Sequence, residues 1–162
     1  MLSASCLVLV VSAQPASGNE EEKEGAGKQN VLSLLLGGTS DRDENAFTVG
    51  LDFEHRIHPL LSVGAVIEYA TEDLDAVTLI GALDLHIWKG FAIQTGPGVE
   101  FAWEEEGEAG GTTSTNRRNF IDRVGALYEF EFTRLLVTPQ VHYDYSSVKD
   151  AVVYAIGLGI RF

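Results

Sequence analysis

The segment Val152-Val153-Tyr154-Ala155-Ile156-Gly157-Leu158-Gly159-Ile160-Arg161-Phe162 ends the sequence and alternates between two kinds of residue. Every second position carries an apolar side chain, and most of these side chains are large. The positions between them carry mainly small residues and one arginine. Because successive side chains of a β-strand point to opposite faces of the sheet, this period of two predicts a strand with one apolar face.

The same period of two runs through most of the chain from about residue 29 onward. In residues 46–58 and 119–132, apolar residues alternate with glycine and charged residues, and no helical period competes. The pattern predicts eight strands, over residues 31–38, 46–58, 60–71, 75–88, 91–103, 119–132, 135–146 and 152–162.

The links between these strands alternate in length. Residues 57–60, 88–90 and 133–134 form tight turns, whereas residues 39–45, 71–75 and 104–118 form longer, more polar links. The link 147–150 is short for its place. Short turns at one end and longer loops at the other are typical of outer-membrane barrels. An even number of strands then puts both termini at the short-turn, periplasmic end.

The composition of the polar face decides which face points inward. Glycine is unfavourable in an exposed strand, but it makes room for long side chains inside a narrow barrel. Glycines on the polar face alternate with charged residues, which we expect in the lumen: Asp52, Glu54, Arg56, Glu68, Glu100, Arg123, Glu129 and Arg161. The sequence therefore predicts an all-β fold, an eight-stranded antiparallel up-and-down transmembrane β-barrel. A soluble lipocalin-like barrel, with the apolar face around an apolar ligand, is the alternative.

Aromatic residues gather near the two ends of the predicted strands. Those at the short-turn end include Trp88, Phe91 and Phe132, and those toward the long-link end include Tyr69, Phe101, Trp103, Tyr143 and Tyr145. Aromatic side chains favour the membrane–water interface because their apolar body and polar edge suit its two sides. We therefore expect these residues to form an aromatic girdle around the barrel.

Composition excludes several classes of protein. The 162 residues are 45% hydrophobic with a mean hydropathy of +0.06, and no stretch approaches the roughly 20 apolar residues of a membrane helix. A net charge of −13 argues against nucleic-acid binding, which needs a basic surface to neutralise phosphates. It argues equally against attachment to anionic lipid through a basic patch.

The N-terminal region divides into two short segments before the barrel. Residues 1–18 are predicted to be a signal peptide, because a short apolar core over residues 7–11 precedes small residues suited to cleavage. No Lys or Arg precedes that core. Residues 19–28 form an acidic flexible spacer, and residues 29–162 form the barrel domain. The single cysteine, Cys6, falls in the signal segment, so the processed chain would contain no disulfide.

Several motifs carry a family resemblance. Gly96-Pro97-Gly98-Val99-Glu100-Phe101, the segments 123–130 and 139–145, and the closing strand resemble small outer-membrane β-barrel proteins of the OmpA/OmpX-like, porin-family type. The terminal Phe162 with Tyr154, Ile156, Leu158 and Ile160 resembles the signal by which the barrel-assembly machinery recognises its clients. The resemblance implies a monomer in the outer membrane of a Gram-negative bacterium, in contact with membrane lipid and lipopolysaccharide.

Few residues suggest chemistry. His142, Asp144 and Ser146 share one face of a strand and invite comparison with a Ser–His–acid triad, and some outer-membrane barrels modify lipid A. No nucleophile elbow or oxyanion donor accompanies them, however. His86 and His142 belong near opposite ends of the barrel, which argues against a metal cluster. We predict no catalytic residue, no metal and no cofactor.

The longest link holds a cluster of carboxylates, Glu104, Glu105, Glu106 and Glu108. Its spacing matches no defined calcium loop, so a solvated acidic loop is expected. Residues 104–118 are nevertheless our candidate contact surface, because loops on a rigid scaffold commonly carry binding.

The predicted function is a non-enzymatic outer-membrane barrel, structural or presenting its loops, with a lumen filled by charged side chains. A narrow cation-biased channel is an alternative, since acids outnumber bases in the lumen. Pro97 and Pro139 fall inside predicted strands, where a missing N–H donor predicts bulges or local breaks.

Overall fold

The computed structural model describes residues 29–41, 45–71, 75–108 and 111–162, and for residues 104–116 it describes the backbone alone. The predicted signal peptide, spacer and Cys6 lie outside the described residues, so they stay predictions. Within the described ranges, no helix is long and apolar enough to cross a membrane.

The chain forms one antiparallel β-sheet in which neighbours along the sequence are neighbours in the sheet. Its strands are β1 (Asn30–Ser40), β2 (Asn45–His58), β3 (Leu61–Ala70), β4 (Ala76–Trp88), β5 (Phe91–Glu108), β6 (Gly111–Tyr128), β7 (Phe130–Phe132), β8 (Leu135–Ser146) and β9 (Ala151–Arg161). Because β6 and β7 pair with the same strand in one continuous register, they form one wall, and the barrel has eight walls.

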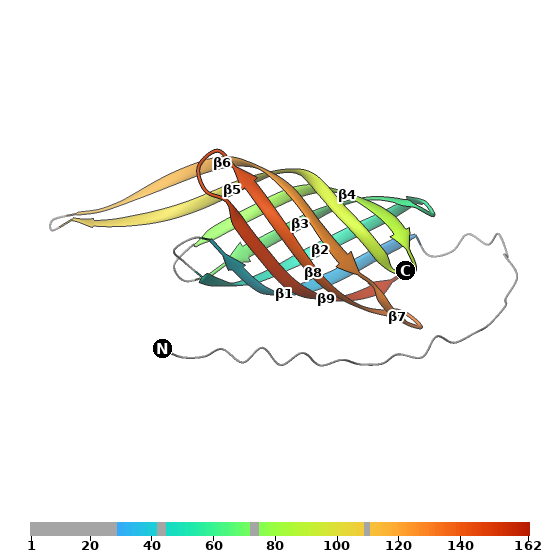
Figure 1. The fold of residues 1–162 in the computed structure, drawn as a ribbon. Coiled ribbons are helices and arrows are strands. Elements are labelled where there is room, and N and C mark those ends of the chain that lie inside the picture. The colour runs from blue at the N-terminus through green and yellow to red at the C-terminus, as the bar shows by residue number, and fades with distance from the viewer. Residues whose placement is uncertain (1–28, 42–44, 72–74, 109–110) are drawn as a thin grey trace, which may run out of the picture.

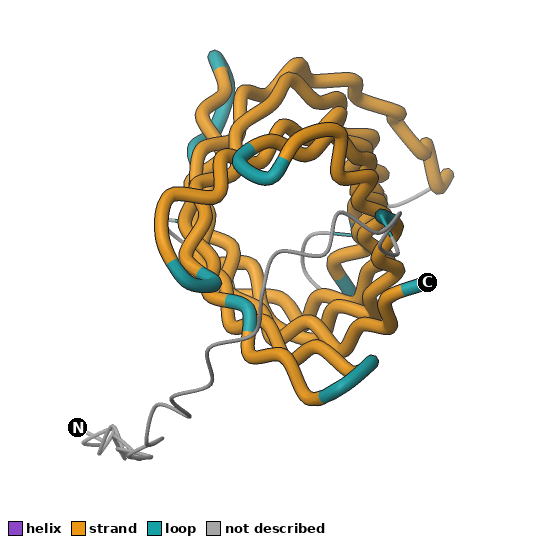
Figure 2. Tube along the Cα trace, turned by 90° about the vertical axis from the view of Figure 1, so that its right-hand side faces the viewer, coloured by secondary structure: helices purple, strands orange, loops and turns teal. Residues whose placement is uncertain are grey.

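The sheet closes on itself. β9 pairs with β1, and β6 pairs with β8, so no edge is left along the barrel. Figure 2 shows the strands as a closed ring. Asn30 and Phe162 exchange backbone hydrogen bonds of 3.1 and 2.9 Å, which places the start of β1 beside the end of the chain, at the turn end (Figure 1). The prediction of an eight-stranded antiparallel barrel is confirmed.

The link between β5 and β6 differs from the prediction. We expected a loop over residues 104–118, but β5 and β6 stay paired from Trp103–Asn116 out to Glu108–Gly111. Because β6 pairs with β8 only from Ile121 onward, the outer part of this hairpin projects beyond the barrel (Figure 1). The residues of the arm have no apolar alternation, so the hydrophobic pattern could not reveal strands that backbone hydrogen bonds alone form.

Both strand prolines interrupt the ladder on one side. The β4–β5 ladder lacks the pairs between Ile80–Gly98 and Leu83–Thr95, where Pro97 lies. The break between β6 and β7 falls opposite Pro139, and the register is the same on both sides of it. Proline has no N–H to donate, so the predicted local breaks are confirmed.

Tight turns connect the strands at the end that holds the two termini of the barrel. Lys89 and Gly90 join β4 to β5 with φ angles of 29° and 90°, the left-handed conformation that two-residue hairpin turns require. Register shifts near His58 and Trp88 fall at the same end. Backbone hydrogen bonding also ties Gly90 to Glu129, at 2.7 Å, so this turn is anchored to the break after β6.

Candidate functional site

Small residues on the inward face allow close contacts between neighbouring strands. A Cβ atom at Gly96 would meet the backbone oxygen of Gly81, and one at Gly125 would meet the imidazole ring of His142. By contrast, a Cβ atom at Gly81 would have its nearest neighbour 3.9 Å away. Glycine at position 125 therefore leaves the space that the His142 ring occupies, and glycine at position 96 lets the backbones of β4 and β5 approach each other.

A buried ion cluster, made of Arg123, Glu68 and Asp144, crosses the middle of the lumen. The Arg123 guanidinium donates two hydrogen bonds to Glu68, at 2.8 and 2.7 Å, and two to Asp144, both at 2.6 Å. Its side chain is only 1% exposed. Bidentate contacts of this kind are charge-assisted and geometrically specific, so they hold β3, β6 and β8 together across the interior.

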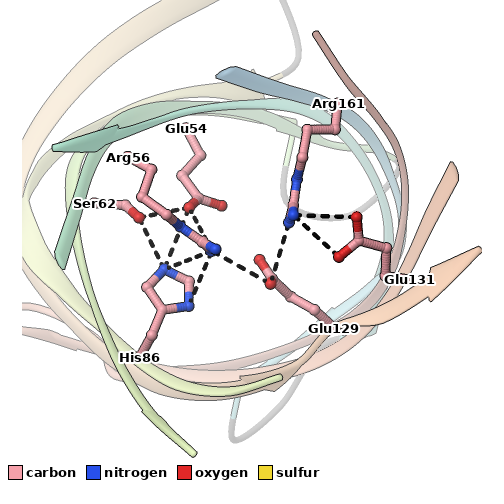
Figure 3. A network of polar contacts seen from close by, with 7 residues as sticks. All are labelled: Glu54, Arg56, Ser62, His86, Glu129, Glu131 and Arg161. Carbon is pink, nitrogen blue, oxygen red and sulfur yellow. Dashed lines mark hydrogen bonds and ion pairs between the residues drawn. The ribbon is translucent and has the colours of Figure 1, made fainter. Parts of the chain in front are cut away.

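A second group, the turn-end cluster, lies closer to the tight turns and is shown in Figure 3. It consists of Glu54, Arg56, Ser62, His86 and Glu129. The Arg56 Nη2 atom lies 3.2 Å from Glu54, 3.1 Å from His86 Nε2 and 3.4 Å from Glu129. The Ser62 hydroxyl donates to Glu54 at 2.5 Å and lies 2.8 Å from His86 Nε2.

Arg161 extends the turn-end cluster on its other side. Its guanidinium lies 3.6 Å from Glu129 and 3.0 Å from Glu131 (Figure 3). Glu129 therefore lies between two guanidinium groups, those of Arg56 on β2 and Arg161 on β9, two strands that both pair with β1. The cluster joins β2, β3, β4, the break after β6 and β9.

The lumen has little free space among the described residues. A cavity of about 10 Å³ is lined in part by Asp52, Glu54 and Asp84, and another of about 20 Å³ by Glu68 and Asp144. A water molecule needs a volume of about 10–15 Å³, so each cavity has room for little more than one water. Buried apolar side chains, among them Leu35, Ile80 and Ile121, fill the lumen together with the polar groups. The lumen is therefore not filled by charged side chains alone, and its small cavities do not match a lipocalin-like cavity for an apolar ligand.

The outward face is apolar. The alternate residues of β9, Tyr154, Ile156, Leu158 and Ile160, are each 50–52% exposed, and Phe162 is 49% exposed. The residues predicted as an aromatic girdle also point outward. Trp88 and Phe132 at the turn end and Tyr69, Trp103, Tyr143 and Tyr145 at the other end are exposed, and Phe91 and Phe101 are half-buried.

The predicted lumen charges lie where the period of two puts them. Glu68 and Arg123 are buried, and Asp52, Glu54, Arg56, Glu100, Glu129 and Arg161 are half-buried. Their partners come from different strands; the Glu100 carboxylate, for example, accepts a hydrogen bond from Asn119 at 3.0 Å.

The suggested triad does not assemble. Asp144 binds Arg123, the Ser146 hydroxyl accepts from the backbone of Val148, and neither ring nitrogen of His142 has a hydrogen-bond partner within the described part of the chain. The side chains of Glu104, Glu105, Glu106 and Glu108 lie outside the described residues.

Several polar members of the lumen were not among the predicted site residues, and those that contact the two clusters or line their cavities include Ser62, Asp84, His86 and Asp144. Each lies on the inward face of its strand, at an even number of residues from another inward residue of the same strand. The period of two could have identified their direction. It could not show that His86 meets Glu54 and Arg56, because that contact joins strands that are not neighbours.

The comparisons bear on the fold. No protein-family profile and no curated protein matches the sequence. The N-terminal β-barrel domain of OprF from Pseudomonas aeruginosa superposes with a TM-score of 0.63, at 12% identity, over 84% of this chain and 99% of that chain. The chain has the fold of small outer-membrane β-barrels.

Two further solved structures share this outer-membrane barrel fold. Ail, the attachment invasion locus protein of Yersinia pestis, gives a TM-score of 0.61 at 11% identity, over 83% of this chain and 97% of that chain. The outer membrane protein OprG from Pseudomonas aeruginosa gives 0.52 at 14% identity, over 87% of this chain and 99% of that chain. The fold is thus retained where few residues are shared.

Proposed function

We propose that this chain is an integral barrel of the outer membrane of a Gram-negative bacterium. We further propose that it acts without catalysis, as a structural element or by presenting the arm of β5 and β6. The observation that carries the proposal is that charged side chains are buried and large apolar side chains are exposed, the reverse of the distribution in a soluble protein. Arg123, Glu68 and Asp144 are buried inside, while most of the large apolar residues of the walls are exposed on the outside.

The outward apolar surface needs an apolar solvent. Monomeric soluble proteins rarely expose continuous apolar patches of more than a few hundred Å², whereas apolar side chains circle this barrel. A strand that crosses a bilayer needs about 9–11 residues when it is tilted by roughly 45°. β3 has 10 residues and β9 has 11. Closure of the sheet meets the other requirement of the bilayer, because it leaves no open strand edge facing lipid.

The ends of the barrel then face different compartments. The tight turns and the C-terminus belong at the periplasmic side, and the longer links and the projecting arm belong at the outer surface. Phe162 and the alternate apolar residues before it would serve as the recognition signal for the barrel-assembly machinery. The proposed surroundings are outer-membrane lipid and lipopolysaccharide, with the barrel as a monomer.

The filled lumen supports a structural role over conduction. The ion cluster of Arg123 spans the interior, and the cavities on its two sides have volumes of only about 10 and 20 Å³. A hydrated ion does not fit such volumes.

Membrane fractionation combined with heat-modifiability tests this proposal. The protein is expected in the outer-membrane fraction, and unboiled samples in detergent gels are expected to migrate differently from boiled ones, because a closed barrel resists detergent. Gly96→Val is the matched control, since its side chain would collide with the backbone of Gly81 and prevent closure. Recovery of the unaltered protein in the soluble periplasmic fraction, with no shift in mobility, would disprove the proposal.

A further inference from the structure

We propose that the turn-end cluster is a binding site for a divalent transition-metal ion. The ligands would be His86 Nε2 and one carboxylate oxygen each from Glu54 and Glu129. Ligand atoms of these three residues all lie within 4.8 Å of one another. One imidazole and two carboxylates are a donor set that suits Zn²⁺, with water in the remaining position.

The geometry of two of the ligands already fits one ion. Glu54 Oε1 and His86 Nε2 are 3.2 Å apart, and two ligand atoms on a tetrahedral zinc ion are separated by roughly 3.3 Å. Ser62 contacts both atoms through its hydroxyl. The hydrogen bond that Ser62 donates to Glu54 holds this carboxylate in a fixed orientation and leaves its oxygen a lone pair for the ion, whereas the contact with His86 Nε2 would be given up when the ion binds.

A positive group already lies between the three ligands. Arg56 Nη2 is within 3.1–3.4 Å of Glu54, His86 and Glu129, and Figure 3 shows its guanidinium between them. This position therefore stabilises a cation. The Arg56 side chain is 27% exposed, and it would turn away from this position when an ion binds. The metal ion and the guanidinium would compete for one place.

The charge of the surrounding lumen favours an additional cation. The carboxyl groups of Asp52, Glu54, Asp84 and Glu129 line one small cavity, and the described ion pairs of Arg56 and Arg161 reach Glu54 and Glu129 alone among these four. Asp84 is 3% exposed, and its Oδ1 atom has no hydrogen-bond partner among the described residues. A buried carboxyl oxygen without a hydrogen-bond partner is costly, and a divalent ion in this part of the lumen would attract it.

The test measures Zn²⁺ binding to the full chain in detergent micelles, by equilibrium dialysis with elemental analysis. The unaltered protein is expected to bind one Zn²⁺ per chain. His86→Asn is expected to weaken binding by at least about 100-fold, beyond the roughly 10- to 100-fold effect of losing a supporting group. Arg56→Met, which removes the competing cation, is expected to tighten binding by about tenfold. His58→Asn, a histidine exposed at a turn, is the matched control and should bind as the unaltered protein does.

A second measurement separates binding from folding. Mobility of unboiled samples reports whether each variant is a closed barrel, and Glu129→Gln replaces His86→Asn if the latter does not fold. Zn²⁺ should raise the urea midpoint of Arg56→Met more than that of the unaltered protein, because a ligand stabilises the state that binds it. The proposal is overturned if folded Arg56→Met binds Zn²⁺ no more tightly than the His86 or Glu129 variant. Equal loss of binding in His58→Asn would also overturn it.

Discussion

Replacing Arg123 with methionine should strongly destabilise the barrel. The guanidinium makes four hydrogen bonds of 2.6–2.8 Å and is 1% exposed. Methionine would leave the carboxylates of Glu68 and Asp144 buried without a counter-charge. Removing one partner of a buried ion pair costs about 3–5 kcal/mol. We expect a loss of free energy of unfolding in that range.

The assay is equilibrium unfolding in urea of the barrel folded into phosphatidylcholine bilayers, followed by the fluorescence of Trp88 and Trp103. Arg161→Met is the matched control, because Arg161 is 19% exposed and its nearer partner Glu131 is 47% exposed, while its more distant partner Glu129 keeps Arg56. A pair of this kind contributes up to about 1 kcal/mol.

A triple variant tests the cause of the loss. Arg123→Met combined with Glu68→Gln and Asp144→Asn removes all three charges, so it should recover most of the stability, since neutral replacements of a buried ion cluster are often tolerated. A loss below about 1 kcal/mol for Arg123→Met, or a triple variant no more stable than the single one, would refute the assignment of the effect to unpaired charge.

Three further outcomes follow from the geometry. Gly96→Ala should reduce the yield of folded barrel in a gel-mobility assay, because the added Cβ meets the backbone of a neighbouring strand, whereas Gly81→Ala should fold normally; equal yields would contradict the close approach. Ile156→Arg, which places a charge on the outward face at mid-strand, should lower stability in bilayers by about 2–4 kcal/mol. Val148→Arg, outside the strands, should change stability by less than about 0.5 kcal/mol, and a similar loss in both would argue against a membrane-facing wall. Phe162→Ala should reduce assembly into the outer membrane of cells while leaving refolding in vitro unchanged; loss of refolding in vitro would instead indicate a packing role.

The hairpin of β5 and β6 shows where sequence patterns stop being informative. The barrel part of both strands has an apolar outward face, so the period of two located it. The arm beyond residue 103 is polar, and its strands are defined by backbone hydrogen bonds that continue the register of the barrel. Backbone hydrogen bonds do not require an alternation of polar and apolar side chains, so the sequence pattern predicted a loop for these residues.

The break after β6 was predicted only in part from the sequence. Pro139 was expected to disturb the ladder because it lacks a donor. The sequence could not show that the disturbance would appear on the facing strand, between β6 and β7, because that depends on which residue lies opposite it.

The sequence by itself determined the parts of the strands that form the barrel wall, their inward and outward faces and the closed barrel, but not the paired arm of β5 and β6. These follow from alternation, which is a local property of each strand, and from the order of short and long links. Only the tertiary structure decided which inward groups meet. Glu54, His86 and Glu129 come from three separate walls, and Arg123 reaches Glu68 across the lumen. Such contacts depend on the tilt and register of the whole closed sheet, which no single strand encodes.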